Sequence, residues 1–279
     1  MLLQDIAYDV RWDRFYECKS EFTVYIKENG VWTPFLVLTA NYPGQGNGEV
    51  LLLRKYLVEE YIQWHGGRRF LHQEQGYYPN STIDTWLNTE YLQRFSPSIQ
   101  ERILVTNVEV WDGRERPNMN RPQSANNRIS TQIIERQVFL LSVTEMGGTV
   151  RWDAVEGEVL DYFNRELIEL STGRRITPTE RFHLYMQRHA TVHDGRKVPL
   201  PIDTSQNLYD LDWWWLRSRR RSVADNTVGI MRESSHSASE HELEQRHARP
   251  AFCLSRDTEV HLMELDGSFI YVIHDQILG

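Results

Sequence analysis

The stretch closest to a known catalytic pattern is His241–Gln245 (HELEQ), a near match to the HExxH motif of zinc proteases. That motif holds zinc through two histidines one helical turn apart, and Gln245 stands where the second histidine is needed. The chain also lacks a glycine-rich phosphate loop and a G-x-S-x-G nucleophile motif. We therefore expect a non-enzymatic protein with no catalytic residue and no cofactor.

Other side chains that can bind metals surround this stretch. They are His236, Glu240, His241 and His247, and an adventitious metal cluster is one interpretation. The interpretation we favour is a solvated polar turn, because Ser239 and Glu242 have the spacing of a helix start. No metal site is expected.

Composition restricts the class of protein. The 279 residues are 40% hydrophobic and 25% charged, which is ordinary for a globular chain that buries a core. The net charge of −8 argues against a nucleic-acid partner. No apolar run reaches the roughly 20 residues of a membrane span, and the polar residues Gln4, Asp5 and Asp9 argue against a signal peptide. Cys18 and Cys253 can pair, but two cysteines do not make a disulfide framework.

Short stretches that either alternate apolar and polar residues or are apolar and aromatic throughout predict strands near both ends of the chain. In the N-terminal part they are Glu21–Lys27, Val31–Ala40 and Glu49–Val58. In the C-terminal part they are Asp212–Ser218, Arg249–Leu254, Val260–Leu265 and Ser268–Ile273. The dipeptides Asn29-Gly30 and Asp266-Gly267 favour tight turns, so each is expected to close a hairpin.

Two helices in tandem are expected near the middle. Ser81 and Asp84 have the spacing of a capping box, and apolar residues follow at helical spacing through Phe95. Ser96-Pro97 begins a second short helix to about Leu104, because proline fits the first helical position.

The remaining elements complete the fold class. Asn107–Trp111 and Val138–Leu141 are expected as strands, and Glu158–Leu170 is amphipathic. Thr177–Glu180 is a capping box that opens a helix to about His189. Helices cluster in the middle without regular βαβ alternation, which predicts an α+β fold.

Four ordered motifs carry a family resemblance. They are WLNTEYLQRFSPSIQERI at Trp86–Ile103, VFLLS at Val138–Ser142, DWWWLRS at Asp212–Ser218 and ARPAFCL at Ala248–Leu254. Together they resemble an uncharacterised domain family of bacterial and phage proteins with the signature WWLRS…VRPA. The chain departs from that family after the WWLRS motif, where Arg219 stands in place of the usual proline.

The motif order of that family is similar to the C-type-lectin-like fold of formylglycine-generating-enzyme relatives. The resemblance implies a mixed twisted sheet with two tandem helices and a C-terminal hairpin. It also implies an N-terminal extension over residues 1–34 and one domain over residues 35–279, with a helical insert at about 156–205. Formylglycine-generating activity requires a cysteine pair near the C-terminus, where this chain has Cys253 alone.

In phages this fold is carried by receptor-binding tail proteins, some of them diversified by retroelements in the C-terminal stretch. The resemblance therefore implies a bacteriophage virion protein of the tail or capsid surface, made in the host cytoplasm. It is expected to bind a host cell-surface protein or glycan, and to act as a homo-oligomer with other virion subunits. The alternative is a structural assembly protein that uses the same segment for subunit contacts.

The polar stretch Arg219–Ala248, between two apolar strands, is expected as a binding loop on a rigid scaffold. The expected ligand contacts within it are Arg219, Arg220, Arg221, Asp225, Asn226, Arg232, Glu233, His236, Glu240 and His241. The expected structural residues of the signature are Trp213, Trp214, Trp215, Arg217, Arg249 and Pro250.

Two features of this stretch leave alternatives open. Successive side chains of a strand point to opposite faces, so Trp213 and Trp215 share one face and Trp214 lies on the other. The rings on one face belong to the core, and a ring on the other face can reach the ligand. The run Arg219–Arg221 is either an anion-binding edge or a solvated charge run.

Overall fold

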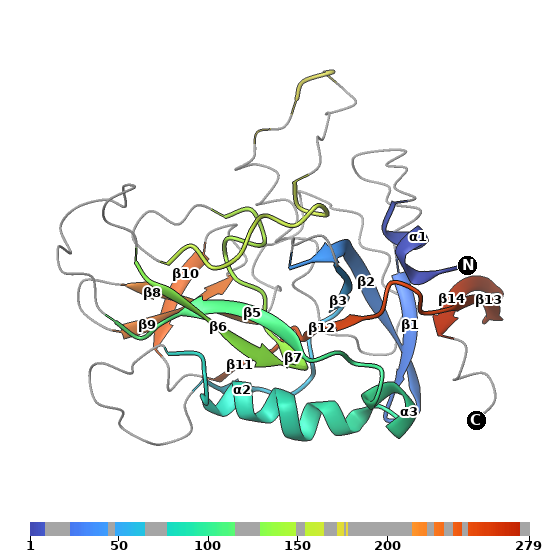
Figure 1. Ribbon diagram of the computed structural model, residues 1–279, viewed down its shortest axis with the longest axis horizontal. Coiled ribbons are helices and arrows are strands. Elements are labelled where there is room, and N and C mark those ends of the chain that lie inside the picture. The colour runs from blue at the N-terminus through green and yellow to red at the C-terminus, as the bar shows by residue number, and fades with distance from the viewer. Residues whose placement is uncertain are drawn as a thin grey trace.

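The computed structural model describes residues 1–8, 23–43, 48–64, 77–114, 129–148, 154–164, 172–175, 177, 214–221, 226–231, 237–241 and 245–273. Its largest element is a seven-stranded mixed sheet with the strand order β13-β14-β1-β2-β3-β12-β7 (Figure 1). The described helices are few and short, so the fold is α+β, as the sequence predicts.

The strands of the large sheet come from both ends and the middle of the chain. They are β1 (Thr23–Glu28), β2 (Val31–Tyr42), β3 (Glu49–Arg54), β7 (Val138–Phe139), β12 (Ala251–Leu254), β13 (Val260–Leu265) and β14 (Ser268–Ile273). The pairing of β1 with β14 is parallel, and the other pairings in the sheet are antiparallel. The middle strand of the sheet is β2, and the neighbouring pair β3 and β12 is fully buried over Val50–Leu53 and Ala251–Leu254.

Two hairpin turns of the large sheet confirm the sequence predictions. Asn29 and Gly30 join β1 to β2 with φ angles of 48° and 81°. Asp266 and Gly267 join β13 to β14 with φ angles of 50° and 73°. Positive φ at both central positions matches the twist of the flanking strands and favours Asn or Asp followed by Gly.

The predicted first helix is divided into three types of turn. It consists of α2 (Thr82–Trp86), the π-turn η1 (Leu87–Tyr91) and the 3-10 turn η2 (Leu92–Arg94). Ser81 caps it as predicted, because its side chain accepts a hydrogen bond from the backbone N–H of Asp84. The Asp84 carboxylate does not complete the capping box on Ser81; it accepts instead from the backbone N–H of Asn80 and from Arg136.

The second helix, α3 (Pro97–Gln100), begins at the predicted proline and ends four residues before Leu104. Ser96 precedes it without a side-chain capping bond. A short N-terminal helix, α1 (Leu3–Tyr8), had no clear sequence signal, and its apolar residues Leu3 and Ile6 are buried.

Three smaller sheets complete the described architecture. They pair β5 (Thr106–Trp111) with β6 (Thr131–Arg136), β4 (Ile62–Gln63) with β11 (Gln245–Arg246), and β8 (Trp214–Arg221) with β9 (Asn226–Met231) and β10 (Ser237–His241). In Figure 1 the β8–β10 sheet lies at the opposite end of the molecule from β13 and β14.

The β8–β10 sheet corrects the expectation of a polar loop between Arg219 and Ala248. Much of that stretch forms antiparallel strands. Hydrogen bonds between the backbones of neighbouring strands hold them together, and these bonds do not require an apolar sequence pattern. Ser239 lies within β10, so it does not begin a helix. Ala248 is buried in the core.

Other expectations fall partly outside the described residues. Residues 156–164, the start of the expected helical insert, run as irregular chain and turns, while the helix expected to about His189 lies outside. Cys253 is a buried free thiol, and Cys18 lies outside. Within the described ranges, no helix has the length and apolar character needed to cross a bilayer.

Candidate functional site

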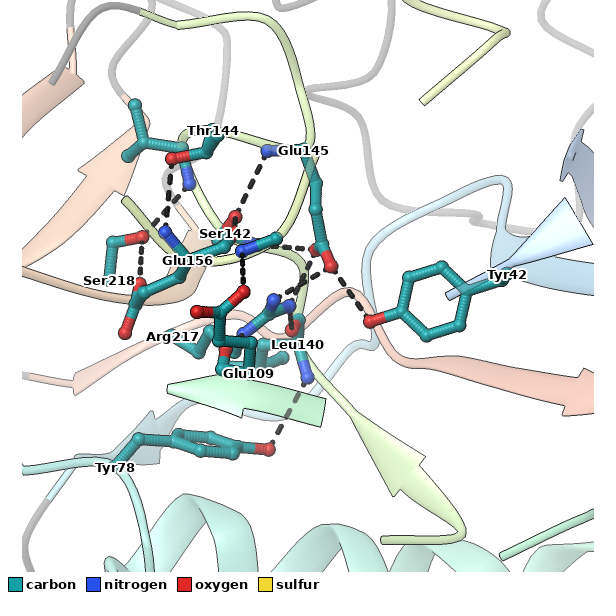
Figure 2. A network of polar contacts seen from close by, with 12 residues as sticks. Tyr42, Tyr78, Glu109, Leu140, Ser142, Thr144, Glu145, Glu156, Arg217 and Ser218 are labelled. Atoms are coloured by element: carbon teal, nitrogen blue, oxygen red, sulfur yellow. Dashed lines mark hydrogen bonds and ion pairs between the residues drawn. The ribbon is translucent and has the colours of Figure 1, made fainter. Parts of the chain in front are cut away.

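Arg217 on β8 forms the centre of a buried polar network (Figure 2). Its Nη1 and Nη2 lie 2.5 and 2.7 Å from the two carboxylate oxygens of Glu145, and neither side chain is more than 1% exposed. Nε donates to the carbonyl of Glu109 at 3.0 Å, and Nη1 also donates to that of Leu140 at 2.8 Å. A planar guanidinium suits this arrangement, because its fixed donors match a carboxylate in two places.

Glu145 connects this network to the large sheet. Its carboxylate accepts a hydrogen bond from the Tyr42 hydroxyl at 2.7 Å and another from the backbone N–H of Ser142 at 2.9 Å. Burial and the Glu145 charge together raise the pKa of Tyr42 well above its usual value. Burial opposes the charge on Arg217, but Glu145 overcomes that effect and raises the pKa of the guanidinium. The guanidinium of Arg217 therefore stays charged at neutral pH.

Glu156 is a second buried carboxylate beside the first. It accepts hydrogen bonds from the backbone N–H of Trp111 at 2.7 Å and from the hydroxyl of Ser218 at 2.5 Å. The Ser218 oxygen in turn accepts from the backbone N–H of Val143 at 3.0 Å. Burial raises the pKa of Glu156 to about 7, although Arg217 acts in the opposite direction. Glu156 therefore titrates near neutral pH.

The described signature residues lie in the interior. Trp214, Trp215, Arg217, Arg249 and Pro250 are all buried, and Trp213 lies outside the described residues. The indole N–H of Trp215 donates to the carbonyl of Ile62 at 2.6 Å. Arg249 donates to two backbone carbonyls, those of Arg54 and Lys55. Neither described tryptophan ring therefore reaches the surface as a ligand contact.

Of the expected ligand contacts, only Arg219 has a described side chain. It is half-buried, with its guanidinium 4.2 Å from the ring centre of Trp111. Arg220, Arg221, Asn226, Glu240 and His241 have described backbones in β8, β9 and β10. Asp225, Arg232, Glu233 and His236 lie outside the described residues.

The strand register brings several of these positions together. Arg219 and Glu240 both pair with Val228, and Arg220 and His241 both pair with Thr227. These are adjacent rows of one ladder, and adjacent rows belong to opposite faces of a sheet. The expected contacts are therefore gathered on one small sheet but divided between its two faces.

His247 does not join the metal cluster that the polar stretch offered as an alternative. Its ring is buried and hydrogen-bonded through Nδ1 to the carbonyl of Val58 at 2.7 Å. Over the ranges that the structure describes, no three His, Cys, Asp or Glu side chains are arranged to hold a metal ion.

A pocket of about 440 Å³ adjoins the network and was missed by sequence reasoning. It lies between β2, the β5–β6 hairpin and the turn at residues 157–161, and Glu145 and Tyr42 are part of its wall. Its carboxylates come from three segments, at Glu109, at Glu145 and at Glu158 with Asp161, so no single local motif indicates it. A wall residue whose type does reflect its local backbone is Gly157, because its φ of 80° favours glycine.

The described fold and site define an α+β domain in which a buried ion-pair network supports a small polar sheet. Residues 47–256 match the model of a domain family of unknown function (DUF6273), and the chain belongs to that family. No curated protein and no solved structure shows significant similarity to the chain.

Proposed function

We propose that the chain is a non-enzymatic binding protein that recognises its ligand through residues 219–247. The observation that carries this proposal is the fixation of β8 immediately before Arg219. Arg217 is held by Glu145, and Ser218 by Glu156, both in the interior. Residues that continue directly from a fixed part of a strand lose little conformational entropy when they bind a ligand. Such preorganisation is a common basis of specific recognition.

The ligand we propose is anionic. Arg219, Arg220 and Arg221 are consecutive on β8. The chain as a whole has a net charge of −8, so this strand is a local concentration of positive charge in an acidic protein. Guanidinium groups bind carboxylates and phosphates with two parallel hydrogen bonds. Acidic glycans and teichoic-acid phosphates of a bacterial surface carry both kinds of group.

The biological setting is also part of the proposal. The order of the motifs in the chain supports a C-type-lectin-like phage virion protein of the tail or capsid surface, acting on a host cell as a homo-oligomer. Symmetric assembly would strengthen a weak single site, because several copies bind one surface together.

A binding assay with a charge-removing double variant tests the proposal. The probes are immobilised wall teichoic acid and neutral dextran, and the variant is Arg220→Ala/Arg221→Ala. Arg219 is retained because of its contact with Trp111. We expect the wild type to bind teichoic acid and not dextran. The variant should bind about tenfold more weakly or worse, since it can no longer form charge-assisted hydrogen bonds from two of the three guanidinium groups.

The matched control is Arg174→Ala/Arg175→Ala, which removes two exposed arginines elsewhere in the chain. Equal losses of affinity in both double variants would indicate a general charge effect and contradict the proposal. A dimer or larger species in sedimentation that the Arg220/Arg221 variant dissociates, without any teichoic-acid binding, would favour the assembly role instead.

A further inference from the structure

The pocket beside the network is large enough for a small ligand. Its volume of about 440 Å³ lies within the usual range of roughly 300–1,000 Å³ for such sites. Buried Tyr42 forms part of its wall, and the Tyr42 hydroxyl is already bonded to Glu145. The walls come from four parts of the chain: the end of β2, the β5–β6 strand pair, Glu145 and residues 157–161.

The polar lining of the pocket is acidic. Glu145 is neutralised by Arg217, but Glu109, Glu158 and Asp161 have no ion-pair partner among the described residues. Neutral donors hold two of them in place. Glu109 accepts from the backbone N–H of Gly157 at 3.0 Å, and Asp161 accepts from the hydroxyl of Thr39 at 2.7 Å. Three negative charges therefore border the pocket without compensation from the part of the chain that the structure describes.

The spacing of these carboxylates argues against a metal ion as the ligand. No three of the described acidic, histidine or cysteine side chains are arranged around one metal position. The walls also contain the aliphatic side chains of Ile133, Val159 and Leu160, and the first two are substantially exposed. A ligand that fits both features carries a positive charge at the end of an apolar chain.

We propose that this pocket binds an alkylammonium group. The three N–H donors of an ammonium match separated carboxylate oxygens, and its methylene chain can lie on the aliphatic wall. The source of the group is a free diamine or the lysine side chain of another polypeptide. This inference does not depend on the function proposed for residues 219–247.

Titration calorimetry of the whole chain tests it with three probes. Cadaverine represents a free diamine, Nα-acetyl-lysine methylamide represents a lysine side chain, and 1,5-pentanediol is the uncharged control. We expect at least one of the amines to bind at millimolar concentrations, more weakly as salt is added, and the diol not to bind. Whichever amine binds more tightly identifies the source.

The decisive variant is Glu158→Gln/Asp161→Asn, which removes two exposed charges and keeps the side-chain shapes. We expect the affinity for the amine to fall about tenfold, a typical consequence of replacing two charge-assisted hydrogen bonds by neutral ones. The matched control, Glu90→Gln/Glu264→Gln, removes two exposed charges outside the pocket and should change the affinity less than about twofold. Binding of the diol equal to that of cadaverine, an equal fall in affinity in both variants, or no amine binding would overturn the proposal.

Discussion

The guanidinium of Arg217 and the carboxylate of Glu145 form a two-point ion pair in the interior, although 72 residues separate them in the sequence. The pair joins β8 to the turn at residues 142–148, and the Tyr42 hydroxyl extends it to β2. A buried ion pair contributes little net stability compared with apolar packing, but a single unpaired charge in its place is strongly unfavourable.

Arg217→Ala should therefore lower the free energy of unfolding by about 3–5 kcal/mol, because Glu145 would remain buried without its partner. The Arg217→Ala/Glu145→Ala double variant should lose less than the sum of the two single changes. Urea denaturation measures both. Arg114→Ala is the control, since Arg114 is 85% exposed, and should leave stability unchanged. Additive effects in the double variant would mean that the two residues act independently.

Glu156 should make stability depend on pH. Its pKa is about 7 in the folded state and about 4.5 when exposed, so protonation favours the folded state. The resulting stabilisation is complete below pH 4.5 and is lost as the pH rises through about 7. Arg217 and Glu145 are the charged groups beside it.

Glu156→Gln imitates the protonated side chain and should remove this pH dependence. The wild type should lose stability relative to the variant between pH 5 and 8, by an amount on the order of 2 kcal/mol. Chemical denaturation at several pH values within this window measures the difference. If the difference stayed constant across the window, Glu156 would not titrate there.

Gly157→Ala should be more harmful than an alanine at another glycine of similar backbone conformation. A Cβ at position 157 would lie 3.0 Å from Oε1 of Glu145, and φ there is 80°. Gly267 has a φ of 73°, and a Cβ there would meet nothing within 4 Å. We expect about 1 kcal/mol of destabilisation at Gly267 and about 2–3 kcal/mol at Gly157. Equal thermal shifts in the two variants would show that Glu145 gives way without penalty.

The two helix caps should respond differently to the same change. Ser81→Ala removes a hydrogen bond to the backbone N–H of Asp84 and should lower the free energy of unfolding by about 1 kcal/mol. Ser96→Ala removes no capping bond and should lower it by much less. Denaturant titrations of both variants check this, and an equal decrease would mean that the Ser96 hydroxyl caps α3 in solution.

Much of the local structure could be predicted from the sequence because its signals act over a few residues. Asn29-Gly30 and Asp266-Gly267 each define a hairpin turn by their own backbone preferences. Ser81 satisfies an N–H three residues ahead, and Pro97 starts α3 because it needs no donor there. The π-turn at Leu87–Tyr91 had no comparable local signal.

The expected site could not be located in the same way. The polar stretch after Ser218 carries no apolar periodicity, so its strands in β8, β9 and β10 depend on cross-strand pairing. The pocket was missed because Glu109, Glu145 and Asp161 come from distant segments. Nothing in their individual neighbourhoods indicates that they share a wall.

The sequence by itself determined the α+β class, the hairpin turns, the helix cap at Ser81 and the apolar strands, since these depend on steric and hydrogen-bonding preferences of adjacent residues. Only the tertiary structure decided that Arg217 pairs with Glu145, that Ser218 pairs with Glu156, and that β1 lies between β14 and β2. These contacts depend on how distant segments pack to satisfy buried charges and strand edges, and local preference does not specify that packing.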